Sequence, residues 1–134
     1  MSTDDSGAIP LRNEADIVQC RRTVRQLALA LQFSLVDQTK IITAASELSR
    51  NTVVYGGGGE MNWDIVTQGI KTGLRLQFTD HGPGIPDLDL ALKDGWTSGA
   101  GMGLGLSGSK RLVHEFDLHS VVGEGTRVTI TRWK

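Results

Sequence analysis

Apolar residues recur at helical spacing in the first part of the chain. From Glu14 they fall on one face of an amphipathic segment, and Ser34, with Asp37 three residues later, starts a second one in the manner of a capping box. The run Gly56-Gly57-Gly58-Gly59 ends the second predicted helix, since four glycines continue a helix only at a large entropic cost. The predicted buried stripes are Ile17, Val24, Leu27, Ala28 and Leu31 in the first helix, and Ile41, Ala44, Ala45, Leu48 and Thr52 in the second.

Apolar and polar residues alternate in the middle of the chain. Residues 61–65 and 74–78 each show the two-residue period of a half-buried strand. Residues 69–73 contain two glycines and can close a hairpin between these strands. The pattern therefore predicts an antiparallel pair of strands.

Loops, short helices and a second hairpin are expected in the last third. A short helix is predicted around residues 88–92, and a glycine-rich loop at residues 94–105 leads into a further helix. Two final strands, at about 118–122 and 126–133, are joined by Gly123-Glu124-Gly125. The predicted buried face of the helix after the loop consists of Ser109, Leu112, Val113 and Phe116.

This order of elements predicts an α+β fold. Helices separated from hairpin-joined strands favour a two-layer sandwich, in which helices cover one face of a mixed, mostly antiparallel sheet. The 134 residues suffice for one core. We expect a tail or edge strand at residues 1–13 and one domain at residues 14–134.

Composition narrows the functional classes. A formal net charge of -1 argues against a protein that coats nucleic acid. The sequence has no apolar run near the ~18 residues needed to span a bilayer, its first ten residues do not resemble a secretory signal, and Cys20 has no partner cysteine. We therefore expect a cytoplasmic protein with no direct contact to membrane or nucleic acid.

Two polar side chains on the second predicted helix suggest a metal site. Glu47 and Asn51 are four residues apart, so both project from the same helix face. An amide oxygen beside a carboxylate suits Mg²⁺ with a positioned base, although a solvated polar face would show the same spacing.

A carboxylate and two glycines follow the strand at residues 74–78. Asp80 can accept a hydrogen bond from an exocyclic amino group, and Gly82 and Gly84 allow backbone to approach a flat ring. An ordinary turn at the end of a strand is the alternative interpretation.

The glycine-rich loop before the next helix favours an anion site. Glycines at alternate positions expose backbone N–H groups, and the helix start adds a positive dipole end, an arrangement suited to a polyphosphate. The apolar residues within the loop need burial, which disfavours a plain flexible linker. The residues concerned are Gly99, Gly101, Met102, Gly103, Leu104, Gly105 and Leu106.

Other motifs are set aside. Residues 103–108 satisfy the pattern G-x-G-x-x-G, but a loop rather than a strand precedes them, so a dinucleotide-binding βαβ unit is rejected. His114 and His119 lack the supporting spacing of a metal site. The sequence has no Walker-type phosphate loop, so any ATP site must be of another kind.

Taken in order, these elements resemble the N-box and glycine boxes of the GHKL superfamily, which share the Bergerat fold. The chain is most similar to RsbT-type serine-protein kinases, relatives of the anti-sigma regulatory factors. The segments that carry the resemblance are residues 36–38, 46–51, 80–87, 103–106 with 110–112, and 123–126.

The resemblance implies a role in partner switching during a stress response. An RsbT-type kinase uses ATP and Mg²⁺ to phosphorylate a serine of a STAS-domain, RsbS-like antagonist. It is held by a STAS-protein complex, the stressosome, and after release it activates a phosphatase or another output protein. The oligomeric state is left open.

The resemblance also assigns roles to residues of this sequence. Glu47 would be the general base and Asn51 the Mg²⁺ ligand, while Asp80 would bind the adenine amino group and Thr126 would close the adenine side. Gly82 and Gly84 would shape the pocket, and Gly99, Gly101, Gly103, Leu104 and Gly105 would form the lid and phosphate cradle. Arg50 would contact phosphate or a partner; Lys110 and Arg111 would add charge near the phosphates or form a solvated helix face.

Three alternatives remain. An anti-sigma factor would use the same pocket, sequester a sigma factor and phosphorylate its own antagonist. The catalytic fragment of a histidine kinase is disfavoured because the chain has no helix pair bearing a phosphoacceptor histidine. A scaffold with a vestigial ATP site is disfavoured by the presence of both Glu47 and Asn51.

Overall fold

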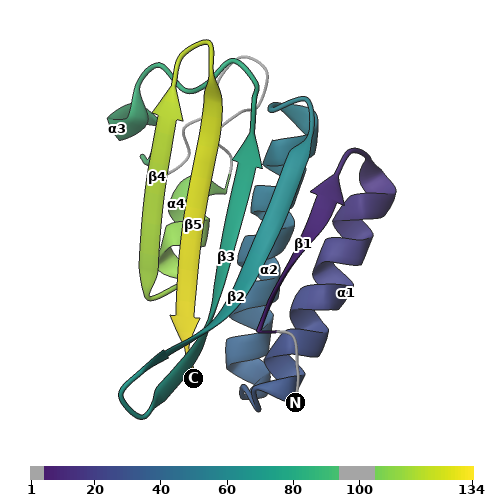
Figure 1. Cartoon of the computed structure of the whole chain (residues 1–134). Coiled ribbons are helices and arrows are strands. Elements are labelled where there is room, and N and C mark those ends of the chain that lie inside the picture. The colour runs from purple at the N-terminus through teal and green to yellow at the C-terminus, as the bar shows by residue number, and fades with distance from the viewer. Residues whose placement is uncertain (1–4, 94–104) are drawn as a thin grey trace.

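The computed structural model describes residues 5–93 and 105–134. These residues form five strands and four helices, which Figure 1 shows along the chain. In order they are β1 (Ser6–Leu11), α1 (Glu14–Ala30), α2 (Leu35–Val54), β2 (Gly59–Gln68), β3 (Lys71–Asp80), α3 (Leu88–Ala91), α4 (Leu106–Arg111), β4 (Glu115–Val121) and β5 (Gly125–Trp133).

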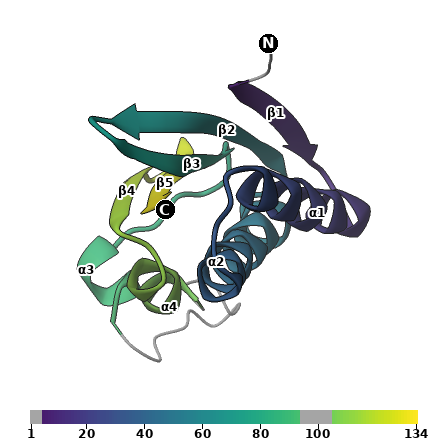
Figure 2. The same cartoon turned by 90° about the horizontal axis from the view of Figure 1, so that it is seen from below.

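The strands form one sheet in the order β1-β2-β3-β5-β4, and every neighbouring pair is antiparallel. Figure 2 shows α1, α2 and α4 on the same side of this sheet. The predicted α+β two-layer sandwich is therefore confirmed, with antiparallel pairing throughout the strands described. The first strand, β1, lies at one edge, where it pairs only with β2.

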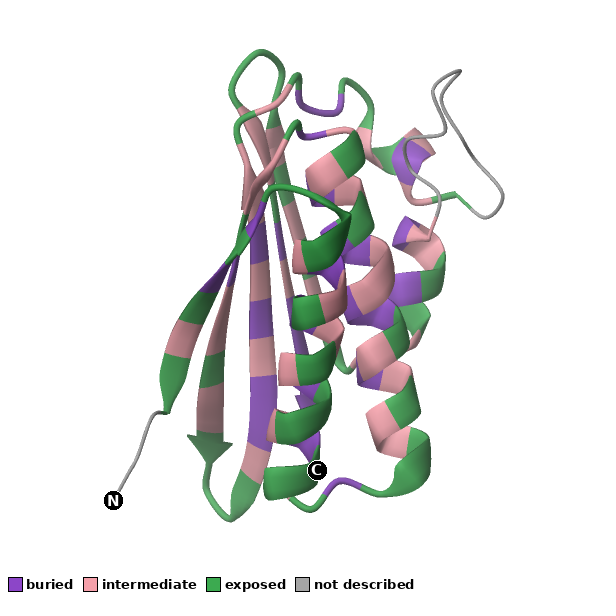
Figure 3. Ribbon diagram, turned by 90° about the vertical axis from the view of Figure 1, so that its right-hand side faces the viewer, coloured by how far each residue is buried: buried purple, intermediate pink, exposed green. Residues whose placement is uncertain are grey.

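Both long helices begin at side-chain caps. Asn13 accepts a hydrogen bond from the Asp16 N–H, and Ser34 accepts one from the Asp37 N–H, so each cap satisfies a backbone donor of the first turn. The apolar face of each helix then packs against the sheet. Figure 3 shows the buried residues gathered where helices and sheet meet. Cys20 belongs to this core, and burial raises the pKa of its thiol to about 12.

The first hairpin turns more tightly than predicted. Only Gly69 and Ile70 lie between β2 and β3, because residues 71–73 belong to β3 and pair with β2. Gly69 has φ +62°, a conformation that glycine adopts without a steric penalty. Ile70 is fully exposed at the tip of the turn.

The prediction of a helix extending to Phe116 is wrong. Helix α4 ends at Arg111, and Phe116 lies on β4, opposite Ile130 of β5. The His114 N–H already donates to the carbonyl of Thr131, so the chain joins the sheet three residues after the helix ends. Phe116 and Leu118 face the core with the two-residue period of a strand, a signal that helical spacing from Ser109 obscured.

An ion pair joins the start of α2 to the last strand. Arg132 of β5 is 9% exposed; one of its Nη atoms donates to a carboxylate oxygen of Asp37, and the other donates to the carbonyl of Leu112 at 2.9 Å. The hydrogen bond from Arg132 is the main cause that lowers the pKa of Asp37. Arg132 therefore connects the start of α2, β5 and the residue that follows α4.

Among the residues described, no helix is both long and apolar enough to cross a membrane.

Candidate nucleotide-binding site

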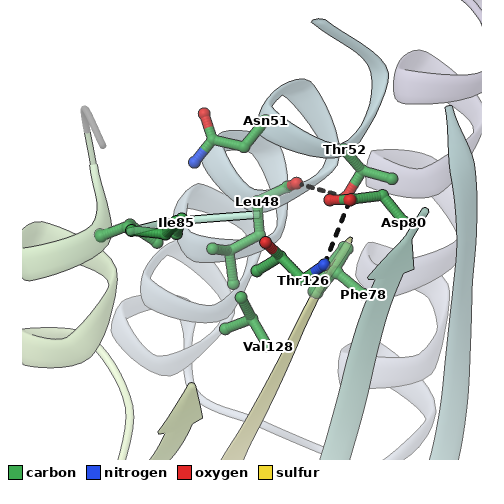
Figure 4. A pocket seen from close by; sticks show the side chains of 9 residues that line it. Leu48, Asn51, Thr52, Phe78, Asp80, Ile85, Thr126 and Val128 are labelled. Carbon is green, nitrogen blue, oxygen red and sulfur yellow. Dashed lines mark hydrogen bonds between the residues drawn. The ribbon is translucent and has the colours of Figure 1, made fainter. Parts of the chain in front are cut away.

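A pocket opens at one end of the sandwich, between α2, the end of β3 and the turn that joins β4 to β5. Figure 4 shows its lining, in which three residues of successive turns of α2 face three strand and loop segments. Most of the wall is apolar, and the polar side chains are few. The lining residues are Leu48, Asn51, Thr52, Phe78, Asp80, Ile85, Leu106, Thr126 and Val128.

Asp80, the last residue of β3, is oriented by two backbone donors. Its Oδ1 accepts hydrogen bonds from the Gly82 N–H at 2.9 Å and from the Thr126 N–H at 3.2 Å. One donor lies two residues after Asp80 and the other 46 residues after it, and both hold the same oxygen. The second oxygen keeps its lone pairs for a donor in the pocket, such as an exocyclic amino group.

The close packing around Asp80 depends on Gly56, which sequence reasoning did not assign to the site. A Cβ on Gly56 would lie 2.4 Å from the Cβ and Cγ of Asp80, so only glycine fits there. A Cβ on Gly82 would likewise lie 2.8 Å from the backbone of Gly56. Gly56 follows α2 directly, and its position within a run of four glycines was the one available signal.

The same run of glycines also contacts the sheet. A Cβ on Gly59 would lie 1.9 Å from the carbonyl oxygen of Thr79, whereas a Cβ on Gly57 would meet open space. The run therefore packs against the end of β3. Gly59 has no room for a side chain there, whereas Gly57 has.

Glu47 and Asn51 lie one turn apart on α2, as their spacing predicted. Asn51 lines the pocket. The side chain of Glu47 lies against Gly105, where an added Cβ would be 2.6 Å from the carboxylate Oε2. Gly105 precedes α4 and has φ +84°, so both its conformation and its contact with Glu47 require glycine. The structure therefore brings the end of the glycine-rich loop to the carboxylate predicted as the base.

The rest of that loop is not described. Gly99, Gly101, Gly103 and Leu104, the other residues predicted to form the lid and phosphate cradle, lie outside the described residues. Leu106, which follows Gly105, is buried and lines the pocket.

Gly84 lies in the loop after β3, and Thr126 lies at the start of β5. Gly84 has φ +78°, and a Cβ there would lie 2.5 Å from the carbonyl oxygen of Val121, so this glycine lets the loop after β3 pack on the end of β4. The Gly123 N–H donates to the carbonyl of Pro83 at 2.9 Å. Thr126 lines the pocket and contributes the N–H that orients Asp80.

The basic residues predicted near the phosphates lie at the surface. Arg50 is about half exposed and pairs with Glu14 of α1, with an Nη2 to Oε2 distance of 3.5 Å. Lys110 is exposed in the last turn of α4. Neither residue lines the pocket described above.

One of the two histidines considered above as metal ligands is hydrogen-bonded to the backbone of β5. His114 accepts a hydrogen bond at Nδ1 from the Trp133 N–H, and partial burial lowers its pKa. In the described part of the chain, His, Cys, Asp and Glu side chains form no group of three that could hold a metal ion. A divalent cation here would depend on Asn51 and on oxygens of a bound phosphate, which is how Mg²⁺ commonly binds in proteins.

These features fit a purine nucleotide. The apolar walls suit a flat ring, the free oxygen of Asp80 suits its amino group, and the glycine contacts keep side chains out of the space around Asp80. The fold and site together define an ATP-binding domain of the Bergerat type.

The comparisons with known proteins agree with this class. Residues 36–134 match the family described as "Histidine kinase-, DNA gyrase B-, and HSP90-like ATPase". "Serine/threonine-protein kinase RsbT" of Bacillus subtilis (strain 168) is 42% identical over 130 residues, which are 97% of this chain and 98% of the relative. The chain therefore belongs to the histidine kinase-, gyrase B- and HSP90-like ATPases and, within them, to the RsbT-type serine/threonine-protein kinases. The resemblance inferred from the motifs is confirmed.

A solved structure shares the fold. The crystal structure of the RsbU and RsbW domains of Rv1364c from Mycobacterium tuberculosis superposes with a TM-score of 0.65 at 17% identity. The match covers 98% of this chain and 33% of that chain.

Proposed function

We propose that this chain binds ATP with Mg²⁺ and transfers the terminal phosphoryl group to a serine of a STAS-domain protein, which acts as its antagonist in a partner switch. In the proposed switch, a STAS-protein complex of the stressosome type holds the kinase. Once released, the kinase activates a phosphatase or another output protein. The likeness to RsbT over nearly the whole of both chains supports this proposal.

One observation carries the chemical part of the proposal. The carboxylate of Glu47 lies against Gly105, the described end of the glycine-rich loop, and Asn51 lines the adjacent pocket one helical turn away. This contact supports Glu47 as the base, because its carboxylate lies beside the segment expected to hold phosphate. Phosphoryl transfer depends mainly on such positioning and on neutralisation of charge.

The remaining roles follow from the geometry of the pocket. The free oxygen of Asp80 accepts from the adenine amino group, and Thr126 closes the adenine side. Asn51 would hold Mg²⁺ through its amide oxygen, and the ion, when bound, neutralises charge on the phosphates. Glu47 accepts the proton of the serine hydroxyl as the serine oxygen bonds to the γ-phosphorus, while the bond from that phosphorus to the β–γ bridging oxygen breaks and ADP leaves.

A transfer assay with radiolabelled ATP and Mg²⁺ tests the function. The chain is incubated with each STAS-domain protein of its host, and we expect label on a serine of one of them. Glu47→Ala should remove the label but leave ATP binding within about twofold, because Glu47 is absent from the lining of the adenine pocket.

The control is Glu124→Ala, which removes an exposed carboxylate from the β4–β5 turn and should leave transfer unchanged. Full activity of Glu47→Ala would show that another group is the base. ATP binding without label on any STAS protein would favour a binding switch, and sigma factors would be the next partners to test.

A further inference from the structure

Ser120 joins the two loops that surround Asp80. It lies near the end of β4, and its Oγ accepts a hydrogen bond from the Ile85 N–H at 2.8 Å. The same oxygen lies 3.1 Å from the carbonyl of Gly125, to which it donates, and 2.8 Å from Oγ1 of Thr126. Ser120 is not among the site residues predicted from the motifs, and it is absent from the pocket lining.

The hydrogen-bond capacity of Ser120 determines the direction of each bond. A serine hydroxyl has one hydrogen and two lone pairs. All three contacts can be hydrogen bonds at once only if the Ser120 hydrogen goes to the Gly125 carbonyl and its two lone pairs accept from Ile85 and Thr126. Thr126 is therefore the donor, and its Oγ1 has only acceptor capacity left for the pocket.

Ser120 thereby stabilises both donors that orient Asp80. The Gly82 N–H belongs to the loop whose Ile85 is bonded to Ser120, and the Thr126 N–H belongs to the start of β5, which is bonded to Ser120 on the other side. Two of the polar side chains that line the pocket, Asp80 and Thr126, consequently present acceptors. A ligand that presents an amino group fits this arrangement.

We propose that Ser120 is a positioning residue for base selection: it holds Asp80 and Thr126 as acceptors and so makes the pocket prefer a purine with a 6-amino group. This inference rests on the proposed ATP binding. Ser120 acts through its neighbours and touches neither base nor phosphate, so its effect concerns recognition of the amino group and not phosphoryl transfer.

The test compares two nucleotides that differ only in that group. Binding of ATP and of purine riboside triphosphate, which lacks the 6-amino group, is measured by calorimetry with Mg²⁺. The wild-type chain should favour ATP by about 10- to 100-fold, the range expected for a hydrogen bond to a charged group. In Ser120→Ala the preference should fall to about threefold or less, mainly through weaker ATP binding.

The kinetics should separate positioning from general damage. In Ser120→Ala, KM for ATP should rise while kcat at saturating ATP stays within about twofold of wild type. The matched control is Thr129→Ala, which removes the acceptor of a Gln77 hydrogen bond on the opposite face of the same hairpin and should keep the wild-type preference for ATP. If Ser120→Ala is too unstable, Ser120→Cys keeps the size of the side chain but hydrogen-bonds weakly, and the same loss of preference is expected.

The outcomes distinguish this inference from the proposed function. A folded Ser120→Ala or Ser120→Cys that keeps the wild-type ratio of affinities would overturn the role of Ser120, and so would a wild-type chain that binds both nucleotides equally. A wild-type chain that binds neither nucleotide would overturn the proposed ATP binding itself.

Discussion

The orientation of Asp80 is maintained by backbone N–H groups, so its chemistry does not depend on a charged partner side chain. Two N–H donors hold one oxygen, and the absence of a Cβ on Gly56 leaves room for the carboxylate. The other oxygen is left as an acceptor. Substitutions at Asp80 and at Gly56 should therefore both weaken ATP binding. The first changes the acceptor itself, and the second displaces it.

Asp80→Asn should weaken ATP binding by at least about tenfold. The amide oxygen can keep the two backbone hydrogen bonds, but the amide nitrogen then faces the pocket as a donor and opposes the adenine amino group. Calorimetric titration with ATP measures the loss. Asp117→Asn, an exposed position on β4, serves as the control and should bind ATP normally. Unchanged affinity in Asp80→Asn would mean that the base does not meet this carboxylate.

Gly56→Ala should destabilise the fold by about 1–3 kcal/mol and weaken ATP binding, since the new Cβ overlaps Asp80. Urea unfolding and calorimetry give the two effects. In Gly57→Ala the methyl group meets open space, so its cost is only the strained positive φ, about 1–2 kcal/mol, without loss of affinity. Equal ATP affinity in the two variants would contradict the packing argument.

At the scale of the element, α2 is held at both ends. Its last turns line the pocket, and its first turn is joined to β5 through the pair of Asp37 and Arg132. Arg132 is buried, and within residues 5–93 and 105–134 its Nε has no hydrogen-bond partner, so its charge depends on Asp37 and on the Leu112 carbonyl. Loss of Asp37 should therefore reduce stability without altering the lining of the pocket.

Asp37→Asn should lower the free energy of unfolding by about 1–3 kcal/mol at neutral pH. Because the pKa of Asp37 is lowered in the folded state, its contribution is fully present above the unfolded value, near 3.9, and is lost as pH falls through the lower folded value. The difference between wild type and Asp37→Asn in urea unfolding should thus shrink below about pH 4. A difference that persists undiminished at acid pH would show that the carboxylate charge is not the cause.

The elements that could be predicted from the sequence are those with long, regular patterns. The cap at Ser34 and the apolar stripes locate α1 and α2, and the alternation in β2 and β3 locates the first hairpin. The residues around Phe116 fit both the helical and the strand period, and their pairing with β5 makes the segment a strand.

Of the site, Asp80, Asn51 and Thr126 could be placed from their motifs. Gly56 and Ser120 could not, because their roles arise from contacts between segments distant in sequence.

At the scale of the whole molecule, the pocket joins both layers and both halves of the chain. Its lining comes from α2, β3, α4 and β5 and from the loop after β3. A ligand that bridges these segments binds only the folded state, so it must stabilise the entire domain.

ATP with Mg²⁺ at about 100 times its dissociation constant should raise Tm by roughly 10 °C, from a stabilisation of about 2.7 kcal/mol. A thermal melt with and without nucleotide measures this shift. Removal of Mg²⁺ with EDTA should shrink it, because the phosphates then lose their counter-ion. The same melt with Asp80→Asn is the control; at the same ATP concentration a tenfold weaker affinity leaves about 1.4 kcal/mol, so the shift should be about half as large or smaller. An equal shift with and without Mg²⁺ would argue against a metal-bound nucleotide.

The dependence of Asp80 on Thr126 also has a consequence during synthesis. Thr126 lies in the last strand, and its N–H reaches Asp80 only when β5 has inserted between β3 and β4. While β5 is still inside the ribosome, the adenine end of the proposed site is incomplete, whatever the preceding elements have formed. Nucleotide bound at Asp80 would therefore mark a chain in which β5 has joined the sheet.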